Sequence, residues 1–322
     1  MKITNNSDIP MALAVWLMHD EYDYKSMQDY ISATSLMKPL RMIILAKRAA
    51  KRDQTADLAD YIPRALGHSL HDSIEKAWTR GHEVNLRKLG VPKDVIDRVR
   101  VNPTDEELRL TKDCIPVYVE QRALKKIGKW TIGGKFDMVA EGIVHDNKST
   151  SAYSWVFGGR DDEHALQGSL YQWLNPEKIT ADFIRICYIF TDWQRFMAKS
   201  NPSYPQQRLA YKDIPLLGIP ATEKWVENKL DLIEHHMETP EPRLPECTRE
   251  ELWMSDPKYK YYANAEKTDG RSTKNFTSLP EAKEFMASKG GKGKIITEQS
   301  EPKRCTYCDV FDDCTQKDKY FS

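Results

Sequence analysis

No apolar run in this 322-residue sequence reaches the roughly 18 residues that a membrane-spanning helix needs. The N-terminus also lacks the basic and then apolar stretches that mark a secretory signal. Because both features are missing, we expect no membrane association and a cytoplasmic location. The chain is long enough for one elaborated domain or two modest ones.

The chain also lacks a net charge, since 48 basic side chains balance 48 acidic ones. Global electrostatics therefore do not indicate a polyanionic partner, and any nucleic-acid surface must be local. Charge runs are usually solvated helix faces. On charge alone we favour that interpretation over DNA binding for the run Lys38, Arg41, Lys47, Arg48, Lys51 and Arg52 and for the pair Lys125 and Lys126.

Cysteines are few, and six thiols in a reducing compartment argue against a disulfide framework. Metal binding or plain burial remains. Two cysteines stand alone, whereas the last quarter of the chain contains Cys247, Cys305, Cys308 and Cys314. The sequence contains no repeat and no low-complexity segment.

Two kinds of hydrophobic pattern divide the chain. The helical pattern predicts N-terminal helices over 10–23 and 31–53, the second capped by Ser32 or Thr34, and further helices over 63–80, 92–112, 161–174, 222–237 and 279–288. The alternating pattern predicts strands over 114–124, 129–140, 142–150 and 182–190, the last of them central. We therefore expect an α/β fold with a mixed sheet behind a helical N-terminal layer.

The segment "GGKFDMVAEGIVHDNKST" predicts a hairpin with Glu141-Gly142 as its turn. In that register Met138 pairs with His145, and Asp137 lies opposite Asp146 on one face with Lys148. Opposed carboxylates repel unless something compensates, and a hard divalent cation would do so. The tripeptide alone is weak evidence, because Asp-x-Lys or Glu-x-Lys recurs at 256–258, 281–283 and 301–303.

Flanking residues give the hairpin a context. His71 precedes it in a helical segment, where a lone histidine is more often a packing residue than a ligand. Gln167 and Tyr171 follow it at helical spacing, which also fits simple amphipathic packing. Each feature is weak alone, and their order is the informative part.

Taken together, the motifs resemble those of the PD-(D/E)XK nucleases, in particular the RecB-like exonuclease branch. The matches are Gly67 to His71, Gly134 to Asp137, Asp146 to Lys148, and Gln167 to Tyr171. The resemblance covers residues 67–171, about a third of the chain. It implies a restriction-endonuclease-like core over 63–238, between a helical segment over 1–62 and a cysteine-containing segment over 239–322. The layout, including "YISATSLMKPLR", looks like a phage-encoded member, whose location would be the host cytoplasm.

The resemblance also implies roles. Mg²⁺ or Mn²⁺ would be bound by His71, Asp137, Asp146 and the carbonyl of Asn147, with Glu120 as a further acidic residue of the catalytic core. Lys148 would orient the attacking water, and Gln167 and Tyr171 would hold the DNA backbone or a water near the site. Asp146 stands where many members have Glu. The implied partner is DNA, as linear ends or single strands, and a recombination or repair protein is a further implied partner.

The C-terminal spacing Cys305-x₂-Cys308-x₅-Cys314 is similar to that of the CRISPR-associated iron-sulfur exonucleases of this branch. Those proteins take their fourth cysteine from before the nuclease core, where this chain has none. We expect Cys247 to replace it. Four thiolates suit a [4Fe-4S] cluster or structural Zn²⁺, and four unligated buried thiols are the plain alternative.

The sequence thus predicts a metal-dependent DNA exonuclease. The alternatives are a catalytically silent DNA-binding or accessory protein on a nuclease scaffold, and a zinc-stapled structural protein. Filled catalytic positions count against the first alternative, and the ordered motifs count against the second.

Overall fold

The computed structural model describes residues 2–20, 27, 29–49, 55–158 and 160–321. The chain divides into two compact units, each described separately below. Unit 1 contains Met1–Met37 and Lys51–Asp231, and unit 2 contains Lys38–Ala50 and Leu232–Ser322. Among the described residues, no helix is long and apolar enough to cross a membrane.

Unit 1 is an α/β structure, as the sequence predicts. Its helices are α1 (Met11–Met18), α2 (Ala33–Leu36), α4 (Ile62–Lys88), α5 (Lys93–Ile96), α6 (Asp105–Leu110), α7 (Ala152–Phe157), α8 (Asp161–Leu174), α9 (Arg195–Ser200) and most of α10 (Ile219–His236). Its strands are β1 (Lys2–Thr4), β2 (Tyr30–Ser32), β3 (Thr55–Asp57), β4 (Val99–Val101), β5 (Ile115–Val119), β6 (Arg122–Ile127), β7 (Trp130–Lys135), β8 (Met138–Ala140), β9 (Ile143–Thr150), β10 (Phe183–Phe190) and β11 (Leu209–Pro215).

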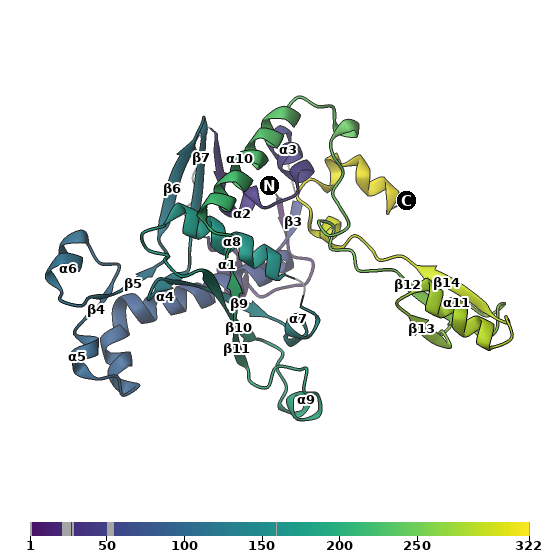
Figure 1. The fold of residues 1–322 in the computed structure, drawn as a ribbon, viewed down its shortest axis with the longest axis horizontal. Helices are drawn as coiled ribbons and strands as arrows, with labels where there is room; N and C mark the ends of the chain where they lie inside the picture. Colours follow the sequence, from purple (N-terminus) through teal and green to yellow (C-terminus); the bar gives the residue numbers. More distant parts are fainter. Residues whose placement is uncertain (1, 21–26, 28, 50–54, 159, 322) are drawn as a thin grey trace. The chain divides into compact units, whose positions relative to one another are not determined.

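The central sheet is mixed and has the strand order β11-β10-β9-β8-β5-β4. Strands β9 and β10 run parallel, which requires a crossover, and α8 lies in that connection. Figure 1 shows β9, β10 and β11 side by side. Strands β2, β7 and β6 form a second sheet, and β1 pairs with β3.

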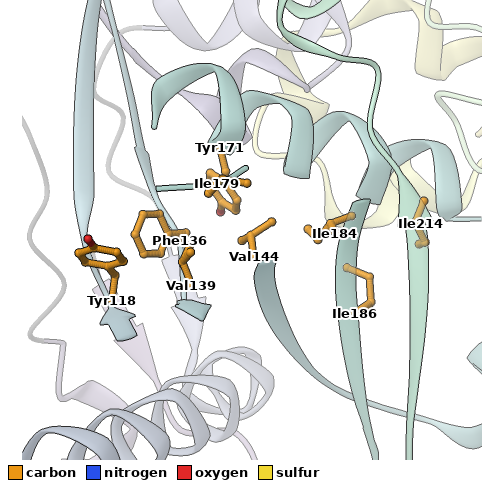
Figure 2. Packing of buried hydrophobic residues seen from close by; sticks show 9 residues of the cluster. All are labelled: Tyr118, Phe136, Val139, Val144, Tyr171, Ile179, Ile184, Ile186 and Ile214. Atoms are coloured by element: carbon orange, nitrogen blue, oxygen red, sulfur yellow. The ribbon is translucent and has the colours of Figure 1, made fainter. Parts of the chain in front are cut away.

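The core beside the site lies between α8 and the central sheet. Figure 2 shows Tyr171 of α8 above Val144 and near Phe136, with Ile184 and Ile186 further along the sheet. Tyr171 is 4% exposed, and Phe136, Val144, Ile184 and Ile186 are fully buried. This packing fixes the helix that carries Gln167 and Tyr171 against the strands that carry the acidic residues.

Two helical glycines should respond oppositely to alanine. A Cβ at Gly168 would lie 2.7 Å from Cβ of Ile184, whereas a Cβ at Gly67 would meet nothing within 4 Å. We expect Gly168→Ala to lower the free energy of unfolding by about 1–2 kcal/mol, because overpacking exceeds the gain in helix propensity. The matched Gly67→Ala should raise it by up to about 1 kcal/mol. Urea unfolding measures both, and changes of the same sign would contradict the packing described.

Several predicted helices differ from those observed. The helix expected over 31–53 is wrong as a single element: it is β2, α2 and then α3 (Leu40–Arg48) of unit 2. Pro39 stands at the N-cap of α3, and proline disfavours helix in the residue before it. The Ser32 cap is confirmed, since its Oγ accepts the N–H of Ser35 at 3.1 Å. The helix expected to end near Gly81 continues to Lys88, because one helical glycine costs only about 1 kcal/mol.

Unit 2 joins α3 to the C-terminal part of the chain. Its other elements are the end of α10, the 3-10 turns Glu241–Arg243, Lys303–Tyr307, Phe311–Asp313 and Thr315–Lys319, the strands β12 (Lys258–Tyr262), β13 (Lys274–Phe276) and β14 (Lys294–Glu298), and the helix α11 (Leu279–Ser288). The three strands form an antiparallel sheet in the order β13-β12-β14. The sequence grouped 38–50 with the N-terminal helical segment, whereas these residues contact the C-terminal segment.

Arg41 and Arg48 of the basic run do not lie on a solvated helix face, whereas Lys47 is exposed as predicted. Arg41 is 3% exposed and donates to the carbonyl of Leu244 at 2.9 Å. Arg48 donates to the carbonyls of Met237 and Thr239 at 2.8 and 2.7 Å. These guanidinium groups therefore hold unit 2 together. Lys51 and Arg52 lie outside the described residues.

Candidate active site and cysteine cavity

The predicted hairpin register is confirmed for all three of its ladder pairs, Met138–His145, Val139–Val144 and Ala140–Ile143. The turn is Glu141-Gly142, and both residues have positive φ, 52° and 76°, as a two-residue turn of type I′ requires. Asp137 directly precedes β8 and so lies next in register to Asp146. Its Oδ2 accepts the backbone N–H of Asn147 at 2.8 Å. The role predicted for the Asn147 carbonyl stays a prediction.

Asp146 is a buried carboxylate, with 1% of its surface exposed. Nζ of Lys148 lies 2.6 Å from its Oδ2, and Nε2 of Gln167 donates to its Oδ1 at 3.3 Å. The contact with Lys148 is an ion pair, but among the described residues Oδ2 accepts no hydrogen bond that meets the usual angular criteria. Burial, reinforced by the charge of Asp137, raises the pKa of Asp146 to about 6 against the opposing effect of Lys148. The ammonium of Lys148 offsets part of this cost.

A second part of the site brings together three elements distant in sequence. Nδ1 of His71, on α4, lies 3.4 Å from Oδ1 of Asp137 and 3.6 Å from Oε1 of Glu120. One donor atom from each of the three residues lies within 4.8 Å of the others, and this is a spacing that could hold a metal ion. Hydrogen bonds to Asp137 and Glu120 raise the pKa of His71 to about 10. The two carboxylates therefore favour a positive charge at this position.

Glu120 adopts an uncommon backbone conformation directly after β5. Its φ is 52°, and its N–H donates to the carbonyl of Asp137 at 2.9 Å. Burial alone would raise the pKa of Glu120, but hydrogen bonds from His71 and Lys135 lower it. Lys135, which the sequence did not single out, forms an ion pair with Glu120. Two cations therefore hold this carboxylate ionised in the metal-free protein.

Gln167 and Tyr171 face the site from α8. Besides its bond to Asp146, Nε2 of Gln167 lies 3.0 Å from the hydroxyl of Tyr171. In these contacts the pair orients the buried carboxylate. The predicted contact of both residues with DNA stays a prediction.

His164 is a neighbour of the site that the sequence motifs do not include. It lies three residues before Gln167 and seven before Tyr171, so it shares their helix face, and it is 8% exposed. The helical spacing of the three residues was the available signal. Burial, with the nearby charge of Lys148, lowers the pKa of His164 to about 4.

The low pKa of His164 predicts an acid-sensitive fold. The folded protein binds the imidazole proton less readily than the unfolded chain, whose pKa is near 6.5. Stability should therefore fall as pH drops from about 6.5 to 4, by up to about 3 kcal/mol. We expect His164→Gln to remove this part of the pH dependence in urea unfolding at pH 7.5, 5.5 and 4.5. Parallel curves for wild type and variant would show that His164 does not contribute.

A cleft of about 950 Å³ opens beside His71, Glu120 and Asp137, the three residues that could hold a metal ion and that we name the metal-ligand group. Its wall contains His71, Glu120 and Asp137 together with residues of α1, α2, α4 and β7. The cleft leaves these three side chains open to solvent and to solutes. The cationic side chains along it include Arg64, Lys76, Arg122 and Lys135.

In unit 2, the four cysteines chosen from the sequence line one cavity. Cys247, Cys305, Cys308 and Cys314 share its wall with apolar Met42, Leu45, Leu252, Val310 and Phe311. Burial raises the pKa of Cys247 to about 12 and also raises those of Cys305 and Cys308. Without a bound cation these thiols stay protonated, and metal binding would release their protons.

The spacing of the four thiols bears on what they could bind. Tetrahedral Zn²⁺ with Zn–S bonds of about 2.3 Å keeps its sulfurs about 3.8 Å apart. Throughout the described chain, which includes all four cysteines, no three thiols lie within 4.8 Å of one another. The four thiols are therefore not held at the spacing of a tetrahedral Zn²⁺ site in the metal-free protein.

Two buried side chains position the cavity wall. Nε of Arg41 donates to Sγ of Cys314 at 3.1 Å, and its Nη2 contacts Glu241. The Gln316 side chain, 4% exposed, accepts the N–H of Cys247 and donates to its carbonyl, both at 2.9 Å. The Gln316 amide thereby fixes Cys247 beside the segment that carries Cys314.

No family model matches the chain, and no curated protein sequence does. Among solved structures, one described as "Crystal structure of SSO0001" is similar to this chain at a TM-score of 0.40 and 16% sequence identity. The similarity covers 68% of this chain and 81% of the other. The functional interpretation therefore depends on the geometry of the two sites.

Proposed function

We propose that this chain is a metal-dependent DNA exonuclease with a restriction-endonuclease-like core of the PD-(D/E)XK type. The observation that carries the proposal is the convergence of His71, Glu120 and Asp137 next to buried Asp146 and its ion-pair partner Lys148. His71, Glu120 and Asp137 line an open cleft. With Asp146 and Lys148 beside them, they supply the metal ligands and the positive charge that metal-dependent phosphodiester hydrolysis uses.

The donor set fits Mg²⁺ or Mn²⁺. Carboxylate oxygens suit both ions, and the imidazole of His71 is also acceptable to Mn²⁺. Asp137 and Asp146, adjacent in register, bring two negative charges together, and this is the second feature that favours a cation here. Such an ion supplies polarisation of the scissile phosphate and a bound water of lowered pKa.

The remaining side chains would stabilise charge on the phosphate and orient the proposed metal ligands. The ammonium of Lys148, now 2.6 Å from Asp146, would stabilise negative charge developing on the phosphate. Gln167 holds Asp146 from the side of α8. Lys135 keeps Glu120 ionised next to His71.

For the cysteine cavity we propose a structural [4Fe-4S] cluster, with Zn²⁺ as the alternative. Four thiols around one cavity, fixed by Arg41 and Gln316, support a ligand role over four unrelated buried cysteines. Binding there would close the segment between Cys247 and Cys305 into a loop.

One nuclease assay tests the proposed activity. Linear DNA labelled at one end, single- or double-stranded, should be degraded progressively when Mg²⁺ or Mn²⁺ is added and left intact in chelator. A protein that binds this DNA without metal and never cleaves it would instead be a binding protein on a nuclease scaffold.

A further inference from the structure

The segment 258–298 carries a local excess of positive charge. It contains nine basic and five acidic side chains, although the whole chain is neutral. The segment consists of β12, β13 and β14 with α11, drawn in yellow-green in Figure 1. Lys274, Lys289, Lys292 and Lys294 gather at one end of it, and we name these four residues the lysine tip.

Contacts with aromatic residues place the four lysines together. The ammonium groups of Lys274 and Lys289 lie 4.7 and 5.4 Å from the centre of the same ring, that of Phe285. Lys274 and Lys294 stand on the two strands that flank β12, opposite Tyr261 and Tyr262 respectively. The hydroxyl of Tyr261 donates to the carbonyl of Lys292 at 2.9 Å. The lysine tip is thus one cluster around the end of β12.

The loop that carries Lys292 is built against the sheet. Gly293 has φ 97°, and a Cβ there would lie 2.4 Å from the carbonyl of Tyr262. The N–H of Gly291 bonds to the carbonyl of Met286 at 3.0 Å, which ends α11. The loop backbone therefore has a fixed course, and its lysines project from a defined base.

No carboxylate among the described residues neutralises the lysine tip. All four lysines are exposed, and within the described part of the chain none of them forms an ion pair. Elsewhere on the same sheet Lys260 pairs with Glu298 at 2.6 Å. Four clustered cations without a counter-charge repel one another, and an anion of extended charge would relieve the repulsion.

We propose that the lysine tip binds the phosphate backbone of DNA and adds affinity for the polymer at a place separate from the metal-ligand group. The proposal rests on DNA being the substrate of the proposed nuclease. A phosphate backbone presents regularly spaced negative charges and is contacted through lysine without regard to sequence. Each contact of this kind releases counterions, so binding through the tip should depend strongly on salt.

The test replaces all four lysines by glutamine, Lys274→Gln, Lys289→Gln, Lys292→Gln and Lys294→Gln. Binding of a fluorescent oligonucleotide is followed by anisotropy over a range of salt, without added divalent metal so that cleavage does not interfere. We expect the affinity to fall at least about tenfold at low salt and the slope of log K against log[salt] to become shallower by about 3, since each lost phosphate contact removes about 0.7–0.9.

A matched control separates the effect of losing the tip lysines from the effect of lowering the net charge of the protein. It carries the same four-charge change at exposed lysines of unit 1, Lys88, Lys93, Lys112 and Lys199. Replacing the tip lysines by arginine should keep both affinity and slope, because the charge is retained. The proposal is overturned if the glutamine variant, folded by circular dichroism, binds like the wild type or no more weakly than the control.

The outcome is distinguishable from failure of the nuclease proposal. Hydrolysis of a small chromogenic phosphodiester with Mn²⁺ needs the metal-ligand group but no polymer contact, so the tip variant should hydrolyse it at the wild-type rate. A wild type that binds DNA through the tip yet hydrolyses neither substrate would refute the nuclease and keep the tip. If the wild type cleaves DNA normally and the tip variant binds DNA as tightly as the wild type, the nuclease proposal is kept and the lysine-tip proposal is refuted.

Discussion

Lys148→Met should lower metal-dependent cleavage of linear DNA by about 10²–10³-fold while the protein stays folded, because one preorganised charge at the reacting phosphate has an effect of this size. In the metal-free protein the ammonium lies 2.6 Å from Asp146. Its loss leaves the other donors in place, so metal binding should persist. End-labelled DNA gives the rate, and isothermal titration with Mn²⁺ gives the affinity.

The aspartates should behave differently from the lysine. Asp137→Asn and Asp146→Asn remove proposed metal ligands, and we expect them to lose cleavage and metal binding together. Lys199→Met, at an exposed position on α9, is the control and should keep both. Cleavage by Lys148→Met at the wild-type rate would remove this lysine from the mechanism.

Cys305→Ala combined with Cys308→Ala should release the metal group that we propose for unit 2. A group present at a thousand times its dissociation constant stabilises the fold by about 4 kcal/mol, and the variant should lose stabilisation of that order. The effect should be confined largely to unit 2, because all four cysteines belong to it. Iron and zinc analysis, visible absorption and limited proteolysis read out by mass spectrometry measure the change.

The control for the cysteine variant is Cys114→Ala, since Cys114 lies in unit 1 and outside the cavity. A brown protein rich in iron would support the cluster, and a colourless one with stoichiometric zinc would replace it by Zn²⁺. Purified wild type that contains neither metal under anaerobic conditions would leave the four thiols as buried side chains.

Local patterns in the sequence predicted the elements around the site well. Helix α8 has the predicted bounds, because the acidic residues Asp161, Asp162 and Glu163 mark its N-terminus. The hairpin register followed from alternation and from a two-residue turn. Both are short-range features, and period and turn chemistry determine them.

Long-range contacts could not be read from the same patterns. The residues around Glu120 in the sequence do not predict its positive φ or its contact with His71. The burial of Arg41 was missed because a charge run gives no sign of partners distant in sequence. Cys247 was chosen by its position in the C-terminal segment, but the Gln316 amide that fixes it is visible only in three dimensions.

The place of α3 in unit 2 has a consequence for synthesis. Arg41 contacts Leu244 and Cys314, which follow it by 203 and 273 residues. At translation rates of about 5–20 residues per second, α3 leaves the ribosome roughly 14 to 55 seconds before its last partner is made. Throughout that interval the apolar side chains of Met42, Ile43, Ile44 and Leu45, buried in the finished protein, lack the C-terminal surface of unit 2. The nascent chain should therefore depend on a chaperone more than its size alone suggests, and truncation near the C-terminus should cause aggregation through a helix at the opposite end of the sequence.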